Sequence, residues 1–385
     1  MLAVVVFHAR GGQHPEVLPG GFLGVSLFFT LSGYLICSLL IGEQERTGSI
    51  RWTAFWARRF RRLSPAAFVV IGACVAIPVV WDGAWGRYLA SADVIAALGS
   101  WSNLWQIHLV DTGRALRVLG PLGPFWSLAL EEQFYLAISV IALLSARTPS
   151  SRRTLAGVLG VIGVGSIVIG LTAKAPDAGG SNVRWLFAPD VRAVELVAGC
   201  LLALSAFGAS AARRPSGEPG ASGLSGARDA AGAPVLDVAG WVAAGLTLLA
   251  FVTLSEGSSF VRHGLFAVAA VVNVVLISGA LAGGSLARAL AWRPLVELGR
   301  LSYTWYLVHW PVILVLRPGR VGIDGAALTV VQVVVGLAVA AALSVLVERP
   351  IRSGRRLPAP ASVWAWLLAA GSIAGVALGL ELARG

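Results

Sequence analysis

Long apolar runs, each close to the length of a membrane-spanning helix, follow one another along almost the whole chain. About 20 mostly apolar residues are needed for a helix to cross the hydrocarbon core of a bilayer. Ten such runs are present, at 22–41, 66–81, 125–145, 155–171, 185–207, 238–254, 260–281, 301–316, 326–347 and 363–382. This pattern predicts an all-α fold, a polytopic transmembrane helix bundle of about ten or eleven spans.

Two further segments fit the pattern less well. Residues 88–109 mix Trp101 and Trp105 with Asp93 and other polar residues, and we expect an interfacial or re-entrant piece there. Residues 1–7 are apolar but too short to span, since seven helical residues rise only about 10 Å. We therefore expect the first helix to be truncated and to begin upstream of Met1, with a half-helix that starts at Met1 as the alternative.

The composition is that of a chain solvated by lipid. Hydrophobic residues make up 57% and charged residues only 13% of the 385 positions, whereas soluble domains contain about 25% charged residues. The net charge of +11 comes from short arginine clusters between apolar runs, so we predict no nucleic-acid partner. Cys37, Cys74 and Cys200 lie in apolar runs, form no metal-like pair and are interpreted as packing residues.

The basic residues also predict how the chain is oriented. If it begins inside the cell, the internal segments contain 19 of the 30 Lys and Arg residues and the external segments contain 10. This bias predicts a multi-pass plasma-membrane protein with a cytoplasmic amino end and an extracytoplasmic carboxyl end. Residues 210–234, rich in Gly, Ala, Ser and Pro, are predicted to be a flexible cytoplasmic linker inside a single membrane domain that covers 1–385.

Ionisable residues at membrane depth are candidate functional residues, because charge inside a bilayer is costly. His8 ends the first apolar run, where a neutral imidazole can act as a general base; a hydrogen-bonded surface histidine is the alternative. Glu131 and Glu132 lie at the head of an apolar helix and point about 100° apart. Such a carboxylate can orient an imidazole or bind a sugar hydroxyl, or it can simply complement the helix dipole.

Two later spans have polar residues along one face. Arg192 and Glu195 lie three residues apart and so share a helix face, either as a neutralising ion pair or as part of a site. Tyr303, Tyr306 and His309 recur at steps of three. This polar-aromatic stripe can line a substrate path, or it can belong to an aromatic belt at the membrane interface.

A basic cluster, Arg58-Arg-Phe-Arg-Arg-Leu-Ser-Pro65, precedes the span at 66–81. It can fix the orientation and contact anionic lipid. Alternatively, Arg58, Arg59 and Arg62 can clamp phosphate groups, because guanidinium suits bidentate phosphate contacts. The sequence contains no GxSxG elbow, no P-loop and no His-x-x-x-His pair, so it indicates neither a hydrolase elbow nor an ATP or metal site.

Seven motifs in order along the chain resemble those of acyltransferase family 3, membrane proteins that include O-acetyltransferases of surface polysaccharides. The motifs are Phe7-His8, Gly24-Val25 through Ser32-Gly33, Arg58-Arg59 through Pro65, Trp126-Ser-Leu with Glu131-Glu132-Gln-Phe-Tyr135, Arg192 with Gly199, Ser302-Tyr303 through His309-Trp310-Pro311, and Val347-Glu-Arg-Pro350. The resemblance covers nearly the whole chain. Seven motifs in register make it specific.

The resemblance implies an enzyme that transfers an acyl group, by default acetyl, from acyl-CoA to a hydroxyl of a carbohydrate or glycosylated small-molecule acceptor. It implies His8 as general base and further site roles for four residues, Glu131, Glu132, Arg192 and His309. Arg58, Arg59 and Arg62 are expected to bind acyl-CoA, and membrane lipid is the other expected partner; no metal or prosthetic group is expected. The alternatives are a secondary transporter of a small polar solute, although no inverted repeat is visible, and a non-catalytic scaffold.

Overall fold

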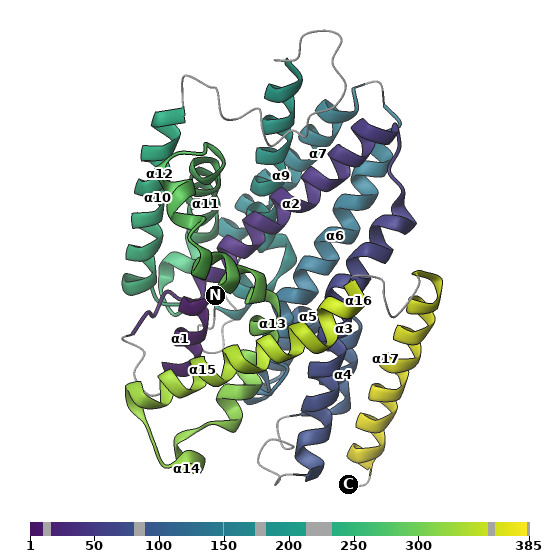
Figure 1. Cartoon of the computed structure of the whole chain (residues 1–385), viewed down its shortest axis with the longest axis vertical. Helices are drawn as coiled ribbons and strands as arrows, with labels where there is room; N and C mark the ends of the chain where they lie inside the picture. Colours follow the sequence, from purple (N-terminus) through teal and green to yellow (C-terminus); the bar gives the residue numbers. More distant parts are fainter. Residues whose placement is uncertain are drawn as a thin grey trace. The chain divides into compact units, whose positions relative to one another are not determined.

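The computed structural model is helical, and the residues that it describes include no strand (Figure 1). Those residues are 1–10, 17–80, 89–148, 150–173, 182–212, 233–352 and 359–382. The prediction of an all-α membrane bundle is confirmed. The predicted flexible linker at 210–234 falls almost entirely outside the described residues.

Each predicted span overlaps a long helix. The long helices are α2 (Leu23–Thr47), α3 (Trp52–Val80), α6 (Phe125–Ser145), α7 (Ser151–Thr172), α9 (Pro189–Ala212), α10 (Ala233–Thr253), α11 (Leu265–Leu281), α13 (Arg293–Val315), α15 (Gly325–Leu343) and α17 (Ala359–Leu382). The short helices are α1 (Leu2–Arg10), α4 (Ser91–Leu98), α5 (Ser102–Asp111), α8 (Val183–Phe187), α12 (Ser285–Leu290), α14 (Pro318–Val321) and α16 (Arg349–Arg352). Two 3₁₀ turns, η2 (Ala115–Leu119) and η3 (Ser259–Arg262), and a π-helical turn, η4 (Ser344–Glu348), complete the order.

Within the described part of the chain, six helical segments are by themselves long and apolar enough to cross a membrane. They are Leu23–Thr47, Trp52–Ile77, Phe125–Ser145, Ser151–Thr172, Pro234–Thr253 and Gly325–Arg352, and shorter apolar helices run over Leu265–Leu281 and Leu367–Leu382. Helices α9 and α13 have the length of a span but contain the buried charges and the polar-aromatic stripe singled out above. Their polarity therefore reflects the candidate site residues.

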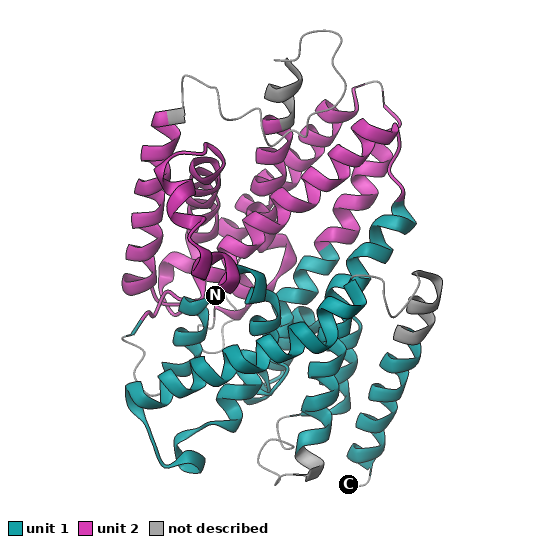
Figure 2. Cartoon of the chain, viewed as in Figure 1, with its two compact units in different colours: residues 1–17, 52–133, 299–385 teal, residues 18–51, 134–298 magenta. Residues whose placement is uncertain are grey.

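The chain packs as two compact units, each built from separated segments (Figure 2). Unit 1 comprises residues 1–17, 52–133 and 299–385, and unit 2 comprises residues 18–51 and 134–298. Helices α6 and α13 each contribute residues to both units. Neither unit is therefore a continuous piece of sequence, and the single membrane domain over 1–385 stays a prediction.

In unit 2, helices α2 and α9 pack with their backbones in direct contact. A Cβ atom added to Gly33 would overlap the carbonyl oxygen of Leu196, and one added to Gly199 would overlap that of Thr30. Only glycine allows helices to approach this closely. The thiol of Cys200 donates to the carbonyl of Gly33 at 3.2 Å in the same crossing. All three cysteines are free and buried, as expected of packing residues.

In unit 1, helix α17 packs against α3 and α4 (Figure 1). The side chain of Ile373 lies over Gly72 of α3, where an added Cβ atom would meet its Cδ1 at 3.8 Å. Near the other end of α17, the Glu381 carboxylate accepts a hydrogen bond of 2.8 Å from the backbone N–H of Ser91. Because Ser91 is the first residue of α4, this contact satisfies one of the backbone donors that a helix leaves unpaired at its start.

The segment predicted to be interfacial or re-entrant forms two short helices, α4 and α5, joined by a tight turn at Ser100. Ser100 has a φ of +58°, a left-handed conformation that is uncommon for a residue with a side chain. The side-chain amide of Gln133 in α6 donates to the Ser100 carbonyl at 2.8 Å and to Asn103 Oδ1 at 2.9 Å. Helix α6 thus fixes the turn of this helical hairpin.

Candidate functional site

Two histidines from opposite ends of the sequence meet in unit 1. His8 lies in α1 and His309 in α13, and the Nε2 atom of His309 is 3.2 Å from the Nδ1 atom of His8. Their ring centroids are 5.0 Å apart, and His309 is only 1% exposed. The sequence predicted each histidine separately, and the fold brings them together.

Neighbouring carbonyl groups determine which nitrogen of each ring holds the proton. The Nδ1 atom of His309 is 2.5 Å from the carbonyl oxygen of Tyr306, so it is the donor and its Nε2 offers a lone pair to His8. The Nδ1 atom of His8 faces that lone pair and also the Val4 carbonyl oxygen at 3.0 Å, so it too is the protonated nitrogen. The Nε2 atom of His8 therefore has an unused lone pair and can accept a proton. Within the described residues, no three His, Cys, Asp or Glu side chains form a metal-ligand cluster.

Trp310 and Tyr306 connect the histidine pair to the start of α6. The ring of Trp310 lies edge-on to His8 at a centroid distance of 5.4 Å, and its Nε1–H donates to the Gly120 carbonyl at 2.8 Å. The Tyr306 hydroxyl accepts a hydrogen bond from Ser127 Oγ at 2.6 Å and donates one to the carbonyl of Pro124 at 3.0 Å. Tyr306 and His309 are buried, so these members of the polar-aromatic stripe face the interior of unit 1.

Glu131 and Glu132 contact different parts of unit 1, as their angular separation predicts. The Oε2 atom of Glu131 is 4.0 Å from Nη2 of Arg59. The carboxylate of Glu132 accepts a hydrogen bond from the hydroxyl of Ser100. Glu131 is thereby associated with the basic cluster and Glu132 with the α4–α5 hairpin. Among the described residues, the side chain that pairs with the His8 ring is His309, and neither glutamate forms a hydrogen bond with that ring.

The basic cluster is helical. Helix α3 begins at Trp52, so Arg58, Arg59 and Arg62 lie in its second and third turns. Arg58 and Arg62 are four residues apart, share one face and are exposed, whereas Arg59 is half-buried. A helical face of this kind can present guanidinium groups to an anionic molecule at the membrane surface.

Arg192 lies in unit 2, where it forms the ion pair that its spacing from Glu195 predicted. Its Nε donates to Glu195 Oε2 at 2.6 Å, Nη1 donates to a carbonyl of α8 at 2.9 Å, and Nη2 donates to Ser26 Oγ at 3.2 Å. The rings of Phe29 and Phe266 face the guanidinium at 4.9 and 4.0 Å. Arg192 is 1% exposed and Glu195 0%, so the pair is fully enclosed and links α9 to α2 and α8.

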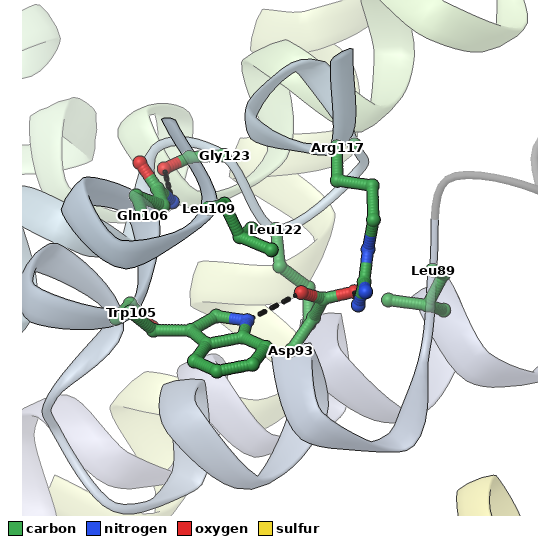
Figure 3. Close-up of a pocket in the computed structure, with 10 residues that line it drawn as sticks. Leu89, Asp93, Trp105, Gln106, Leu109, Arg117, Leu122 and Gly123 are labelled. Atoms are coloured by element: carbon green, nitrogen blue, oxygen red, sulfur yellow. Dashed lines mark hydrogen bonds and ion pairs between the residues drawn. The ribbon is translucent and has the colours of Figure 1, made fainter. Parts of the chain in front are cut away.

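A small pocket in unit 1 lies among α4, α5 and the turn that precedes α6 (Figure 3). In it the Asp93 carboxylate accepts from Trp105 Nε1 and from Arg117 Nη2, both at 2.7 Å. The sequence marked Asp93 and Trp105 only as polar and aromatic interruptions and gave Arg117 no role. Their pairing depends on the hairpin, which hydropathy alone does not predict.

Comparison with known protein families identifies the family of this chain. A family model described as an acyltransferase domain matches residues 1–349. The chain belongs to acyltransferase family 3. This family match confirms the resemblance drawn from the seven motifs. Helix α17 lies beyond the matched range, and α16 begins at its last residue.

The curated relatives of this chain include proteins named as O-acetyltransferases. The chain is 32% identical over 356 residues to YrhL of Bacillus subtilis, a candidate peptidoglycan O-acetyltransferase, covering 92% of this chain and 53% of the relative. It is 31% identical over 320 residues to the peptidoglycan O-acetyltransferase OatA of Listeria monocytogenes, covering 83% and 48%. It is 31% identical over 317 residues to the O-acetyltransferase OatA of Staphylococcus aureus, covering 81% and 49%.

The chain therefore spans about half the length of the curated relatives it matches. No solved structure matches it significantly.

Proposed function

We propose that this chain is an integral membrane O-acyltransferase that transfers an acyl group, by default acetyl, from acyl-CoA to a hydroxyl of a carbohydrate acceptor. Family membership supports the reaction class, and the relatives named as peptidoglycan O-acetyltransferases support a carbohydrate acceptor. A glycosylated small molecule is the other acceptor class. The observation that supports the mechanism most directly is the hydrogen-bonded pair of His8 and His309.

In this mechanism His8 is the general base. Its Nε2 removes the proton from the acceptor hydroxyl while that oxygen attacks the acyl carbonyl. The new ester C–O bond forms, the thioester C–S bond breaks, and the coenzyme A thiolate leaves and takes the proton back from the imidazolium. His309 keeps His8 in the required tautomer by accepting from its Nδ1–H, so it is a positioning residue. General-base catalysis contributes about 10²–10⁴-fold to the rate.

We assign the donor to the basic cluster on α3. Arg58, Arg59 and Arg62 bind the phosphates of acyl-CoA, and Glu131 positions Arg59 for this contact. Glu132 holds the α4–α5 hairpin through Ser100. A cytoplasmic amino end puts the cluster on the side where acyl-CoA is made and His8 towards the outer end of α1.

The first test compares cells that express the native chain or His8→Ala, matched for membrane insertion. Ester-linked acetyl on extracted surface glycan, read by mass, should appear with the native chain and fall by about 10²–10⁴-fold with His8→Ala. His263→Ala, which changes an exposed histidine of unit 2, should retain the ester. A membrane-inserted His8→Ala protein with full activity would exclude the general-base role. Release of free coenzyme A only when acceptor is present excludes a transporter.

Arg59→Ala tests the donor site. The substitution removes charge-assisted hydrogen bonds to phosphate from a half-buried side chain. We therefore expect the KM for acetyl-CoA to rise by about tenfold, whereas the KM for the acceptor stays unchanged. Initial rates of thiol release in detergent measure both constants. Arg61→Ala, on another face of the same helix, is the matched control. An Arg59→Ala enzyme with the native donor KM would reduce the cluster to a role in orientation and lipid contact.

A further inference from the structure

The pocket of Figure 3 is suited to a neutral polar group. Its cavity volume is about 10 Å³, the lower limit for one water molecule or one hydroxyl group. Asp93 and Arg117, the charged side chains that line it, are paired with each other at 2.7 Å. Asp93 also accepts from the indole of Trp105 and from a backbone N–H, each at 2.7 Å. Because the charges already satisfy one another, the pocket has little to offer an ion.

Two buried side-chain atoms of the pocket have no hydrogen-bond partner, Ser102 Oγ and Gln106 Oε1. Ser102 is 3% and Gln106 5% exposed. The amide nitrogen of Gln106 donates to the Gly123 carbonyl at 2.7 Å, which leaves its oxygen as the unused acceptor. The two residues lie one helical turn apart on α5 and so face the same space. A buried polar group without a hydrogen-bond partner is destabilising, so a ligand that pairs with both is favoured.

We propose that this pocket is a subsite for a hydroxyl group of the carbohydrate acceptor. The hydroxyl donates to Gln106 Oε1 and accepts from Ser102 Oγ. A hydroxyl can do both, whereas a carboxylate or phosphate dianion cannot donate and an ammonium group cannot accept. The inference rests on the proposed function, since it gives the acceptor of that reaction a second point of attachment.

Trp310 links the pocket to the histidine pair. Gly120 and Gly123 line it, and the Gly120 carbonyl accepts from Trp310, whose ring contacts His8. A single backbone turn therefore borders both the pocket and the residues around His8. The hydroxyl bound in the pocket is a different one from the hydroxyl that is acylated, and it fixes the position of the sugar relative to His8.

Aromatic and basic side chains surround Trp105 at the edge of the pocket. Trp105 stacks on His108 at 5.2 Å and meets Trp101 edge-on at 5.9 Å. The guanidinium groups of Arg114 and Arg117 lie 5.8 and 6.0 Å from its ring centroid. Ligand sites commonly combine aromatic walls with a few placed polar groups, and this combination suits a sugar, which has apolar C–H faces and a rim of hydroxyls.

Ser102→Ala is the direct test, because the Ser102 hydroxyl has no protein partner and its removal leaves no group unpaired. The purified full chain is titrated with a tetrasaccharide of N-acetylglucosamine without acyl-CoA. Loss of one neutral hydrogen bond should raise the Kd by about 2- to 12-fold. Ser102→Val, which fills the cavity, should weaken binding further. Ser372→Ala, which changes an exposed serine of α17, should bind like the native chain.

Equal affinities for these four proteins, or no saturable binding by the native chain, would overturn the subsite and leave a pocket for a structural water only. Kinetics separate this outcome from the proposed function. Native binding that depends on Ser102 without any ester formed from acetyl-CoA would refute the function and keep the subsite. Ester formation with the same acceptor KM in the native chain and in Ser102→Ala would refute the subsite and keep the function.

Discussion

At the scale of single residues, His8 is partly buried and Arg192 is fully buried, and their hydrogen bonds leave them with different capacities. Arg192 donates from all three guanidinium nitrogens, to Glu195, to a carbonyl and to Ser26. His8 retains the lone pair of Nε2. A base needs an unused lone pair, whereas a guanidinium tied at every nitrogen holds helices together. The contacts of Arg192 thus favour a structural role for this side chain over a direct role in the reaction.

Arg192→Leu should therefore destabilise the protein. It leaves the Glu195 carboxylate buried without its partner, and breaking a buried ion pair in this way costs about 3–5 kcal/mol. The double variant Arg192→Leu with Glu195→Leu removes both charges and should recover most of that loss. Thermal unfolding in detergent, followed by intrinsic tryptophan fluorescence, measures the difference.

The pair of Arg184 and Asp190 supplies the control for this prediction. Both side chains are about a third exposed, at 33% and 39%, so Arg184→Leu should change the free energy of unfolding by no more than about 1 kcal/mol. Equal stability of the single and double Arg192 variants would contradict the structural assignment. A double variant that is stable but inactive would instead indicate that Arg192 takes part in the reaction.

The sequence singled out most residues of the candidate site one by one, but it did not predict how they pair. The ion pair of Arg192 and Glu195 was predictable because partners three apart share a helix face whatever the tertiary fold. His8 and His309 lie at opposite ends of the chain, so their contact depends on how α1 and α13 pack. Ser102 and Gln106 carried no signal, because an unpaired hydroxyl or amide is recognisable only once its surroundings are known.

At the scale of helices, hydropathy located each long helix but misplaced some ends. Helix α3 begins at Trp52 and not near residue 66, because hydropathy reports the lipid-embedded part of a helix and the arginines extend it beyond that part. The span predicted as continuous over 185–207 is divided into α8 and α9 between Phe187 and Pro189. Proline is favoured at the first turn of a helix, where its missing N–H is not needed.

The crossing of α2 and α9 should not tolerate a larger residue at its glycines. Gly199→Ala places a methyl group against the backbone of Thr30, and overpacking of this kind costs about 1–3 kcal/mol. Gly160→Ala on α7 is the matched control, because a Cβ atom there meets nothing within 4 Å. That control should be neutral or slightly stabilising, since alanine favours helix. The same melting temperature for both variants would show that the crossing can relax.

At the scale of the whole molecule, successive spans are expected to put connecting segments on alternate sides of the membrane. The proposed orientation can therefore be tested by chemical labelling of residues in these segments. The native cysteines are buried, so one added cysteine reports its own location. A membrane-impermeant maleimide should label Ser255→Cys in intact cells, because residue 255 follows α10 on the predicted outer side. Ser49→Cys, in the exposed turn after α2, should react only after the membrane is opened. The reverse labelling pattern would invert the topology and with it the side of acyl-CoA binding.

The contact between α17 and the rest of unit 1 has a consequence for chimaeric proteins. The match to the family model ends at residue 349, yet Glu381 caps α4 and Ile373 covers Gly72 of α3. A graft of residues 1–349 alone would present the flank of α3 to lipid and leave one N–H of α4 without its carboxylate. The portable module is therefore longer than the range of the family model, and an exchange between relatives should include α17.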